Sequence, residues 1–111
     1  MDKQQAVRRI REDFKTCQQI LSAIGNDTRQ SIITALMETT CTNGLRVGEI
    51  TELTHLSRPA VSHHLRILRE AGIIRVREEG AKNFYYMDVR TNLGTLRNVV
   101  THIDEFIERF Y

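Results

Sequence analysis

Apolar residues recur with the same helical spacing at both ends of the chain. In each terminal segment, steps of three and four residues alternate between six apolar positions, which places them in one narrow stripe along a helix. The first stripe consists of Val7, Ile10, Phe14, Cys17, Leu21 and Ile24. The second stripe consists of Leu93, Leu96, Val100, Ile103, Ile107 and Phe110.

Two interpretations of these stripes are open. Either helix alone can simply cover the core of its own subunit. Two such stripes at opposite ends of a short chain favour instead a helical layer shared by two copies of the chain. We therefore expect a homodimer formed by the terminal helices, through all residues of the two stripes except Ile24 and Leu93.

Glycine and capping residues divide the chain between the stripes into shorter elements. Gly25 is expected to end the first helix, and Asn26 or Asp27 to cap the second. A polar loop over residues 39–44 separates the second helix from a third over about residues 47–53. The residues expected to face the core are Ile32, Ile33 and Leu36 in the second helix and Val47, Ile50 and Leu53 in the third.

A fourth helix follows, with a clearly marked start and end. Ser57 is expected to cap it, Pro59 falls in its first turn, and Gly72 ends it. At about 100° per residue, apolar residues fall on one side of this helix and polar residues on the other. The apolar residues are Val61, Leu65 and Leu68, and the polar side carries Arg58, Pro59, Ser62, His63 and Arg66.

The polar side of the fourth helix has the composition of a surface that reads DNA. A helix-turn-helix domain inserts the N-terminal part of its second helix into the major groove, where arginine pairs with guanine. The alternative is a solvated polar face that binds nothing. We expect DNA contacts from Arg58, Pro59, Ala60, Ser62, His63 and Arg66. His64, at the edge of the apolar side, is expected to pack or hydrogen-bond within the protein.

A β-hairpin is expected directly after the fourth helix. Residues 73–77 and 84–89 alternate in polarity as two strands, and residues 78–83 connect them. A basic hairpin tip can reach phosphates or the adjacent minor groove, although Glu78 and Glu79 reduce its positive charge. The hairpin residues expected to contact DNA are Arg75, Arg77, Lys82 and Asn83. The predicted fold is therefore mainly helical with a small β-hairpin, a winged helix-turn-helix in the order α-α-α-α-β-β-α.

Composition and charge agree with a small globular protein of this kind. The 111 residues, 41% hydrophobic and 27% charged, fit a single domain over residues 1–111. The formal net charge is +2, and residues 46–90 carry that whole excess, with eight basic residues against six acidic ones. No run is apolar enough to span a membrane and no export signal is visible, so we expect a cytoplasmic protein.

Patterns typical of enzymes are absent. The sequence has no nucleophile elbow, glycine-rich phosphate loop or clustered set of histidine and cysteine ligands. His63 and His64 alone cannot form a site, because neighbouring helical residues point about 100° apart. We therefore expect neither an enzyme nor a bound cofactor.

Several short segments in the middle of the chain form a recognisable set. They are residues 23–29, 56–65, 68–74, 79–80 and 84–86, among which Val61-Ser62-His63-His64-Leu65 is the most specific. This set resembles the ArsR/SmtB family of bacterial winged-helix repressors. The resemblance implies a dimer that binds an inverted-repeat operator in double-stranded DNA and often releases it when an effector binds. It also implies a dimer interface between the terminal helices, which the two stripes indicate independently.

The effector sites of that family are poorly matched. Its arsenic-type site uses a Cys-Val-Cys segment before the recognition helix, and the matching residues 46–48 contain no thiolate. Its zinc-type site is half matched by His102 and Glu105, but Val89 and Thr91 occupy the other half. Two ligands are too few for tight zinc binding, so we expect no metal site and a solvated or interface His–Glu pair instead.

The two cysteines leave a redox response open. Cys17 lies in the first stripe, where a free cysteine usually acts as a small buried hydrophobe. Cys41 is expected to be exposed and is the better candidate for thiol sensing, and the helix lengths place it too far from Cys17 for a disulfide. The favoured function is an operator-binding dimeric repressor without the usual metal sites. The alternatives are a thiol-responsive or weakly metal-responsive repressor, and a winged helix used for protein–protein contact.

Overall fold

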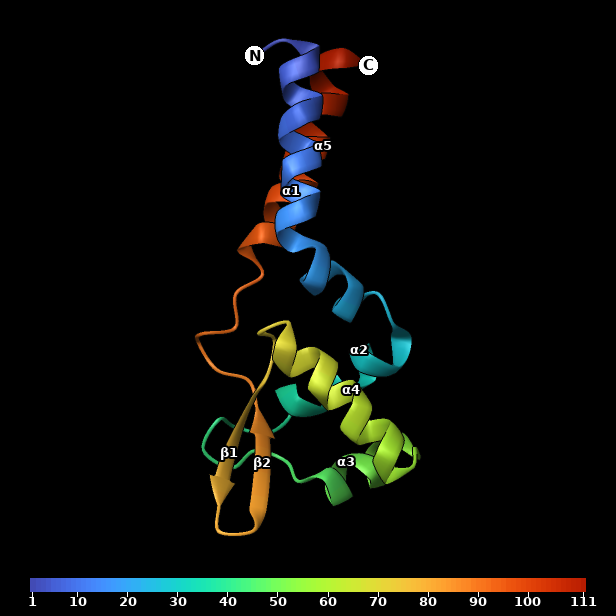
Figure 1. Cartoon of the computed structure of the whole chain (residues 1–111), viewed down its shortest axis with the longest axis vertical. Coiled ribbons are helices and arrows are strands. Elements are labelled where there is room, and N and C mark those ends of the chain that lie inside the picture. Colours follow the sequence, from blue (N-terminus) through green and yellow to red (C-terminus); the bar gives the residue numbers. More distant parts are fainter.

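The computed structural model describes every residue of the chain, Met1–Tyr111. Its elements follow the predicted order, α-α-α-α-β-β-α (Figure 1). They are α1 (Lys3–Ile24), α2 (Asp27–Met37), α3 (Val47–Thr54), α4 (Arg58–Glu70), β1 (Arg75–Glu79), β2 (Lys82–Tyr86) and α5 (Gly94–Phe110). None of these helices is long and apolar enough to cross a membrane.

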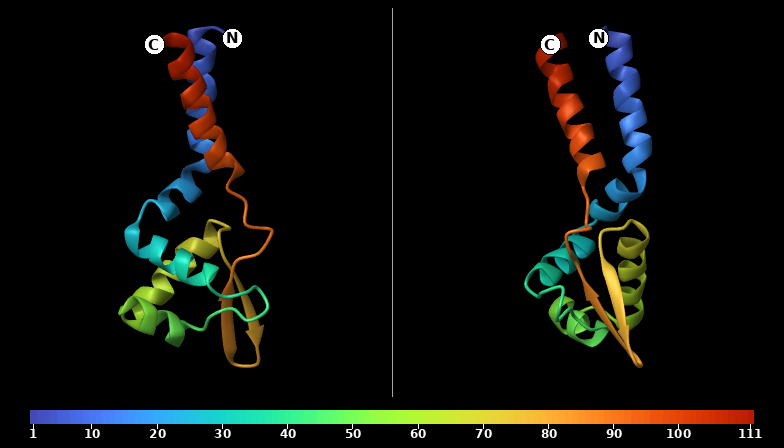
Figure 2. Two further views of the ribbon diagram at one scale, coloured as in Figure 1. Left: turned by 180° about the vertical axis from the view of Figure 1, so that it is seen from behind. Right: turned by 90° about the vertical axis from the view of Figure 1, so that its left-hand side faces the viewer.

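The molecule consists of a stalk and a body. The stalk is formed by α1 and α5, which lie side by side and antiparallel and carry both termini at the free end (Figures 1 and 2). The body contains α2, α3, α4 and the hairpin. The radius of gyration of 17.2 Å exceeds the roughly 13 Å of a compact domain of this length, because the stalk extends away from the body.

Local capping residues end the helices as predicted. Gly25 ends α1, and the side chain of Asn26 caps α2. After α4, Gly72 takes a φ of +76°, and the N–H of Ile73 donates to the carbonyl of Leu68 at 3.0 Å. This is the Schellman arrangement, in which a glycine in the left-handed region turns the chain away from the helix. The turn delivers the chain from α4 directly into the hairpin.

One apolar core holds the body together. α4 contributes three of its residues, and the rest come from the end of α1, from α2 and α3, and from the hairpin with the segment before it. The buried residues are Ala23, Ile32, Leu36, Ile50, Val61, Leu65, Leu68, Ile73, Ile74 and Tyr85. Burying one leucine or isoleucine side chain contributes about 1.5–3 kcal/mol. The core therefore fixes α4 on several elements at once.

One predicted core position in α3 is wrong. Ile50 is buried and Val47 half-buried, but Leu53 is 56% exposed. Two steps of three residues turn a helix through about 600°, so Val47 and Leu53 lie about 120° apart around the axis. Ile50, between them, faces the core, and Leu53 faces solvent.

The hairpin reaches closer to its tip than predicted. Glu79 pairs with Lys82, so the turn has two residues in place of the six predicted over residues 78–83. Gly80 takes a φ of +63°, which a two-residue turn needs at its first position. The predicted long loop was wrong because opposite charges on facing residues favour strand pairing. At the base, residues 73–74 join the core before the first strand begins.

A segment just before α3 pairs with the hairpin. Leu45 and Tyr85 exchange two backbone hydrogen bonds of 2.8 Å. Gly44 has a φ of +64°, and a Cβ there would lie 2.9 Å from the carbonyl oxygen of Tyr85. A side chain at this position would strain the backbone and push the hairpin away from the start of α3.

Gly44→Ala is expected to destabilise the protein more than Gly80→Ala. Both substitutions place a Cβ at positive φ, which costs about 1–2 kcal/mol. The space around Gly80 is open, so only Gly44→Ala adds a contact with Tyr85. Urea unfolding followed by circular dichroism measures both variants. Equal losses would show that the Leu45–Tyr85 pairing accommodates the extra carbon.

Candidate nucleic-acid interface

α3 and α4 are joined by a short turn, as in a helix-turn-helix. α3 ends at His55, which takes a left-handed φ of 58° and donates its N–H to the carbonyl of Thr51 at 2.8 Å. The Ser57 hydroxyl accepts a hydrogen bond from the N–H of Ala60, and Pro59 lies in the first turn of α4. The turn and cap are as predicted, and they fix the direction in which α4 leaves α3.

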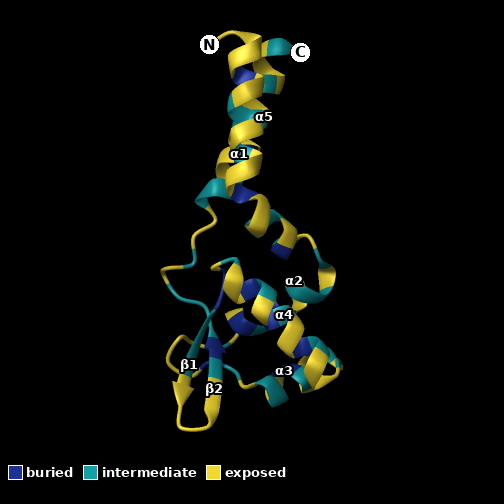
Figure 3. Cartoon of the chain, viewed as in Figure 1, coloured by how far each residue is buried: buried dark blue, intermediate teal, exposed yellow.

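α4 has one buried and one exposed side. Val61, Leu65 and Leu68 are at most 1% exposed and pack into the core. Ala60 is half-buried. Arg58, Pro59, Ser62, His63 and Arg66 stay exposed along the first turns. Buried and exposed stretches alternate along the ribbon of α4 (Figure 3). The predicted polar side of the helix is therefore free to meet another molecule.

The two adjacent histidines of α4 lie in different surroundings. His63 is exposed, and its Nδ1 lies 3.4 Å from Nη2 of Arg66. His64 turns toward α2, where its Nδ1 lies 3.1 Å from Nη1 of Arg29. Burial, and then the positive charge of Arg29, lower the pKa of His64 below its ordinary value. The prediction that His64 bonds within the protein is confirmed.

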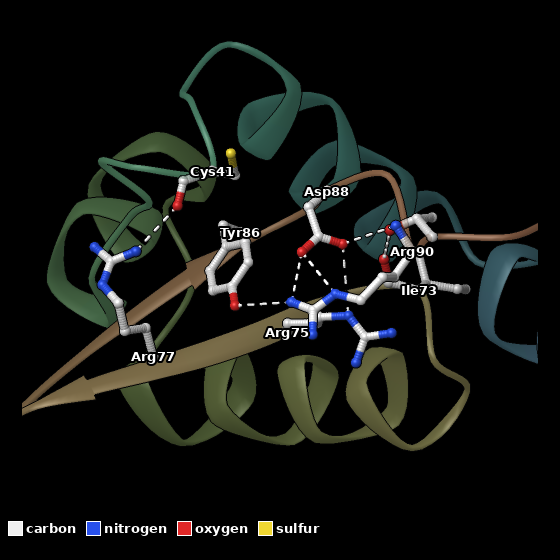
Figure 4. A network of polar contacts seen from close by, with 8 residues as sticks. Cys41, Ile73, Arg75, Arg77, Tyr86, Asp88 and Arg90 are labelled. Carbon is white, nitrogen blue, oxygen red and sulfur yellow. Dashed lines mark hydrogen bonds and ion pairs between the residues drawn. The ribbon is translucent and has the colours of Figure 1, made fainter.

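Arg77 of β1, expected to contact DNA, makes its contacts inside the protein. Its guanidinium donates to the carbonyl of Cys41 at 3.0 Å (Figure 4). It also donates to the carbonyl of Thr42 at 2.7 Å and pairs with Glu79 at 2.7 Å. It also lies 5.2 Å from the ring centre of Phe84. Arg77 thus ties the loop after α2 to the hairpin.

Asp88 contacts two arginines at the base of the hairpin. Its carboxylate accepts from Nε of Arg90 at 2.9 Å and lies 3.6 Å from Nε of Arg75 (Figure 4). The hydrogen bond from the Arg90 side chain lowers the pKa of Asp88. Next to it, the Thr91 hydroxyl donates to the carbonyl of Ile73 at 2.8 Å. These contacts hold the segment that leads from the hairpin to α5.

A cleft of about 370 Å³ lies between the start of α3, the start of α4 and the tip of the hairpin. Arg46, Arg58 and Asn83 contribute to its lining, with Glu49 and Glu52 on the α3 side. Glu49 is turned back, since its carboxylate accepts from the backbone N–H of Arg46 at 3.0 Å. Sequence reasoning missed Arg46; the available signal was a basic residue just before a helix N-terminus, which favours anions.

The two apolar stripes are divided between the inside of the stalk and its surface. Cys17 is 1% exposed. Val99, which lies outside the predicted stripe, is 4% exposed. Among the ten stripe residues expected at the dimer interface, five are partly buried: Ile10, Leu21, Leu96, Ile103 and Phe110. Four others, which we call the exposed strip, are Val7, Phe14, Val100 and Ile107, with exposed fractions from 36% to 55%. One neighbouring helix covers only the half of each stripe that faces it.

His102 and Glu105 do not form a pair with each other. Within the stalk, His102 hydrogen-bonds to Asp13 and Glu105 pairs with Arg9 at 3.2 Å. Both contacts join α5 to α1 in the same chain, so the expected His–Glu pair is replaced by two separate links. No three histidine, cysteine, aspartate or glutamate residues lie close enough to hold a metal ion.

Both cysteines are free, as predicted. Cys17 is buried in the stalk, and Cys41 is exposed in the loop after α2. The loop around Cys41 is held by its backbone carbonyl, which accepts from Arg77, so the thiol itself is not needed for that contact.

A helix-turn-helix whose second helix exposes a polar side, followed by a two-stranded wing, defines a winged-helix DNA-binding regulator. Residues 26–76 match the bacterial regulatory protein, arsR family. A helix-turn-helix transcriptional regulator of Methanocaldococcus jannaschii is 39% identical over 77 residues, 68% of this chain and 82% of that protein. The transcriptional repressor SdpR of Bacillus subtilis is 30% identical over 90 residues, 81% of this chain and 91% of that protein.

The fold is also shared with solved structures. An ArsR family transcriptional regulator superimposes with a TM-score of 0.70 at 17% identity, covering 85% of this chain and 92% of that one. The chain belongs to the arsR family of bacterial regulatory proteins. It is therefore a DNA-binding transcriptional regulator and not an enzyme, which confirms the predicted fold and class.

Asp88→Asn is expected to destabilise the protein at neutral pH, because it removes the negative charge between Arg75 and Arg90. The pKa of Asp88 is lowered in the fold, so its stabilisation is present above the ordinary carboxyl pKa and is lost as the pH falls through the lowered value. The difference in unfolding free energy between wild type and Asp88→Asn should therefore shrink in strong acid. Urea unfolding at a series of pH values measures it.

Glu78→Gln is the matched control for that experiment. Glu78 is exposed and forms no ion pair, so its substitution should leave stability nearly unchanged at every pH. A difference for Asp88→Asn that does not vary with pH would show that the shape of the side chain, and not its charge, holds the hairpin base.

Proposed function

We propose that the protein is a homodimeric repressor that binds an inverted-repeat operator in double-stranded DNA. The main support for this proposal is the way α4 is placed: its apolar side lies in the core, and its arginine, histidine and serine side chains are exposed. A rigid helix of this kind fits the major groove, where each base pair presents a distinct set of donors and acceptors. The tip of the wing lies beside the start of α4, since Asn83 and Arg58 line the same cleft.

The base contacts are assigned to the exposed side of α4. Ser62, His63 and Arg66 carry the hydrogen-bonding groups there, and the Arg66 guanidinium suits O6 and N7 of guanine. Pro59 and Ala60, at the start of the helix, lie where the chain approaches the DNA most closely. These five residues supply the sequence preference of the proposed interface.

The phosphate contacts are assigned to groups around the cleft and at the wing tip: Arg46, Arg58, Lys82 and Asn83. Such contacts orient a protein on DNA without reading its sequence. Arg75 and Arg77 are left out of this set, because their guanidinium groups already meet Asp88 and Glu79. We propose that these two arginines stabilise the conformation of the wing.

The second copy of the chain is proposed to cover the exposed strip. Val7 and Phe14 on α1, and Val100 and Ile107 on α5, are each seven residues apart, the repeat of helices that pack on other helices. An interface through the stalk leaves both α4 helices free, so two half-sites can be bound at once. A two-fold dimer then requires an operator with inverted symmetry.

Repression is proposed by analogy with the repressor SdpR, and the likeness to the transcriptional activator HlyU of Vibrio cholerae makes activation the alternative. We expect no metal effector, since residues 46–48 lack thiolates and His102 and Glu105 are separately engaged. Response of Cys41 to oxidation is the second candidate mode, because the thiol is exposed. Reporter expression from the bound promoter distinguishes the modes: repression relieved by peroxide supports the second, and increased expression in the presence of the protein contradicts repression.

The experiment that tests DNA binding is a salt titration. Fluorescence anisotropy with DNA from upstream of the protein's own gene measures the affinity at several salt concentrations. The three basic residues assigned to phosphate in each subunit, six in a dimer, predict a log–log slope of about −5. A slope near zero would contradict the proposal and favour a winged helix used for protein–protein contact.

Arg66→Ala is expected to weaken operator binding by about 1–3 kcal/mol and to relax the preference at one base position. Arg46→Ala should weaken binding to all sequences alike and make the salt slope less negative, because it removes a phosphate contact from each subunit. Anisotropy against a set of single-base operator variants separates the two results. Unchanged selectivity in Arg66→Ala would show that Arg66 contacts phosphate only.

Val100→Asp is expected to dissociate the dimer, because an unpaired charge in a buried interface costs about 3 kcal/mol or more. Asn98→Asp introduces the same charge on the same helix, about 200° away around its axis, and should leave the dimer intact. Analytical ultracentrifugation measures both. A dimeric Val100→Asp variant would place the interface elsewhere.

A further inference from the structure

The end of α1, the start of α2 and α4 come together where the stalk meets the body (Figure 1). Arg29 of α2 contacts both of the other helices. It lies in the first turn of α2, and its Nε donates to the carbonyl of Ala23 at 2.7 Å, with Nη2 3.2 Å from the carbonyl of Ser22. Both carbonyls belong to the last turn of α1, which attracts positive charge. Nη1 of the same guanidinium contacts Nδ1 of His64 on α4 at 3.1 Å.

The contact between Arg29 and His64 requires a neutral histidine. A guanidinium has only donors, so the Nδ1 of His64 must offer a lone pair and the ring proton must lie on Nε2. A protonated ring would have no acceptor and would place a second positive charge beside the guanidinium. The groups that face His64 are Arg29 from α2 and His63 from α4 itself, and α1 presents backbone carbonyls to the same guanidinium.

The position of this contact links it to DNA recognition. His64 directly follows His63, which is exposed on the proposed DNA-binding side, and α1 carries half of the exposed strip. We infer that Arg29 and His64 are positioning residues, which hold the recognition helix against the end of α1 only while His64 is neutral, so that acid weakens operator binding. The inference rests on the proposed function.

The direction of the pH effect follows from the surroundings of His64. Burial, then Arg29 and His63, lower its pKa, so the ring is neutral at neutral pH and the contact is intact. His64 takes up a proton more readily when the chain is unfolded, or when its contact with Arg29 is broken, than when that contact is formed. The free-energy cost of holding His64 neutral against Arg29 therefore begins near the ordinary histidine pKa and grows as the pH falls.

The test compares His64→Gln with His55→Asn between pH 7.5 and pH 5. His55 is an exposed histidine without an assigned DNA contact, and asparagine tolerates its left-handed φ. The glutamine side-chain oxygen can accept from Arg29 but does not titrate. Anisotropy is measured on a duplex that the wild-type protein selects from a randomised pool. From neutral to acid pH, the wild-type Kd should rise relative to that of His64→Gln by about tenfold, the scale of one hydrogen bond to a charged group. His55→Asn should keep the wild-type loss.

A second measurement does not depend on DNA. NMR titration of the His64 ring in the free protein should show a pKa below the ordinary histidine value, and Arg29→Met should raise it. A pKa unchanged by Arg29→Met, or a Kd ratio that does not vary with pH, would overturn the positioning role. Absence of DNA binding by the wild type at every pH would instead overturn the proposed function itself, while the NMR titration still decides whether the contact exists.

Discussion

The burial of one side of α4 is the constraint on which the rest of the molecule depends. Val61, Leu65 and Leu68 are almost inaccessible and bind the helix to α2, α3 and the segment before the hairpin. A helix that presents side chains to a rigid partner must keep a fixed rotation about its own axis. Neighbouring side chains point about 100° apart, so a rotation of that size would present a different residue. Three buried side chains over two turns prevent that rotation. The exposed side of α4 is therefore defined by what the opposite side buries.

The same core connects the stalk to α4. Ala23, at the end of α1, is fully buried among residues of the body, and Arg29 binds the carbonyls of that helix end. Half of the exposed strip, Val7 and Phe14, lies farther out on the same helix. A second copy that packs on the strip would fix the direction of α1, and the buried end of α1 would pass that direction to the body. In the proposed dimer, the packing of the two stalks would therefore set the spacing of the two recognition helices.

Local signals account for the part of the fold that the sequence predicted correctly. Capping groups such as Asn26 and Ser57, and the glycine after α4, act within a few residues, so their effect can be read from neighbouring letters. The apolar stripes predicted both terminal helices for the same reason. The stripes do not say which half is covered by the chain's own partner helix, and the buried Val99 shows that packing selects positions beside a stripe as well as on it.

Contacts between distant segments were not predictable in the same way. Arg77 binds the carbonyls of Cys41 and Thr42, and every residue has a carbonyl, so nothing in the side-chain pattern marks these two. The two-residue turn is not predicted by its composition, because charged residues such as Glu79 and Lys82 are typical of loops, although facing opposite charges stabilise strands. The exposed side of α4 and the existence of the hairpin were therefore predictable, while the length of its strands was not, and the DNA contacts of both elements stay predictions.

The distribution of ion pairs changes what the net charge means. The central segment has a formal excess of +2, which alone is a weak argument for nucleic acid. Asp88 and Glu79 pair with Arg75, Arg90 and Arg77 at the wing, so those arginines contribute little to the field at the surface. The basic groups around the start of α4 and the cleft have no such partners. Glu49 and Glu52 line the same cleft as Arg46 and Arg58, so the placement of single basic groups, and not the sum of formal charges, decides how this surface meets an anion.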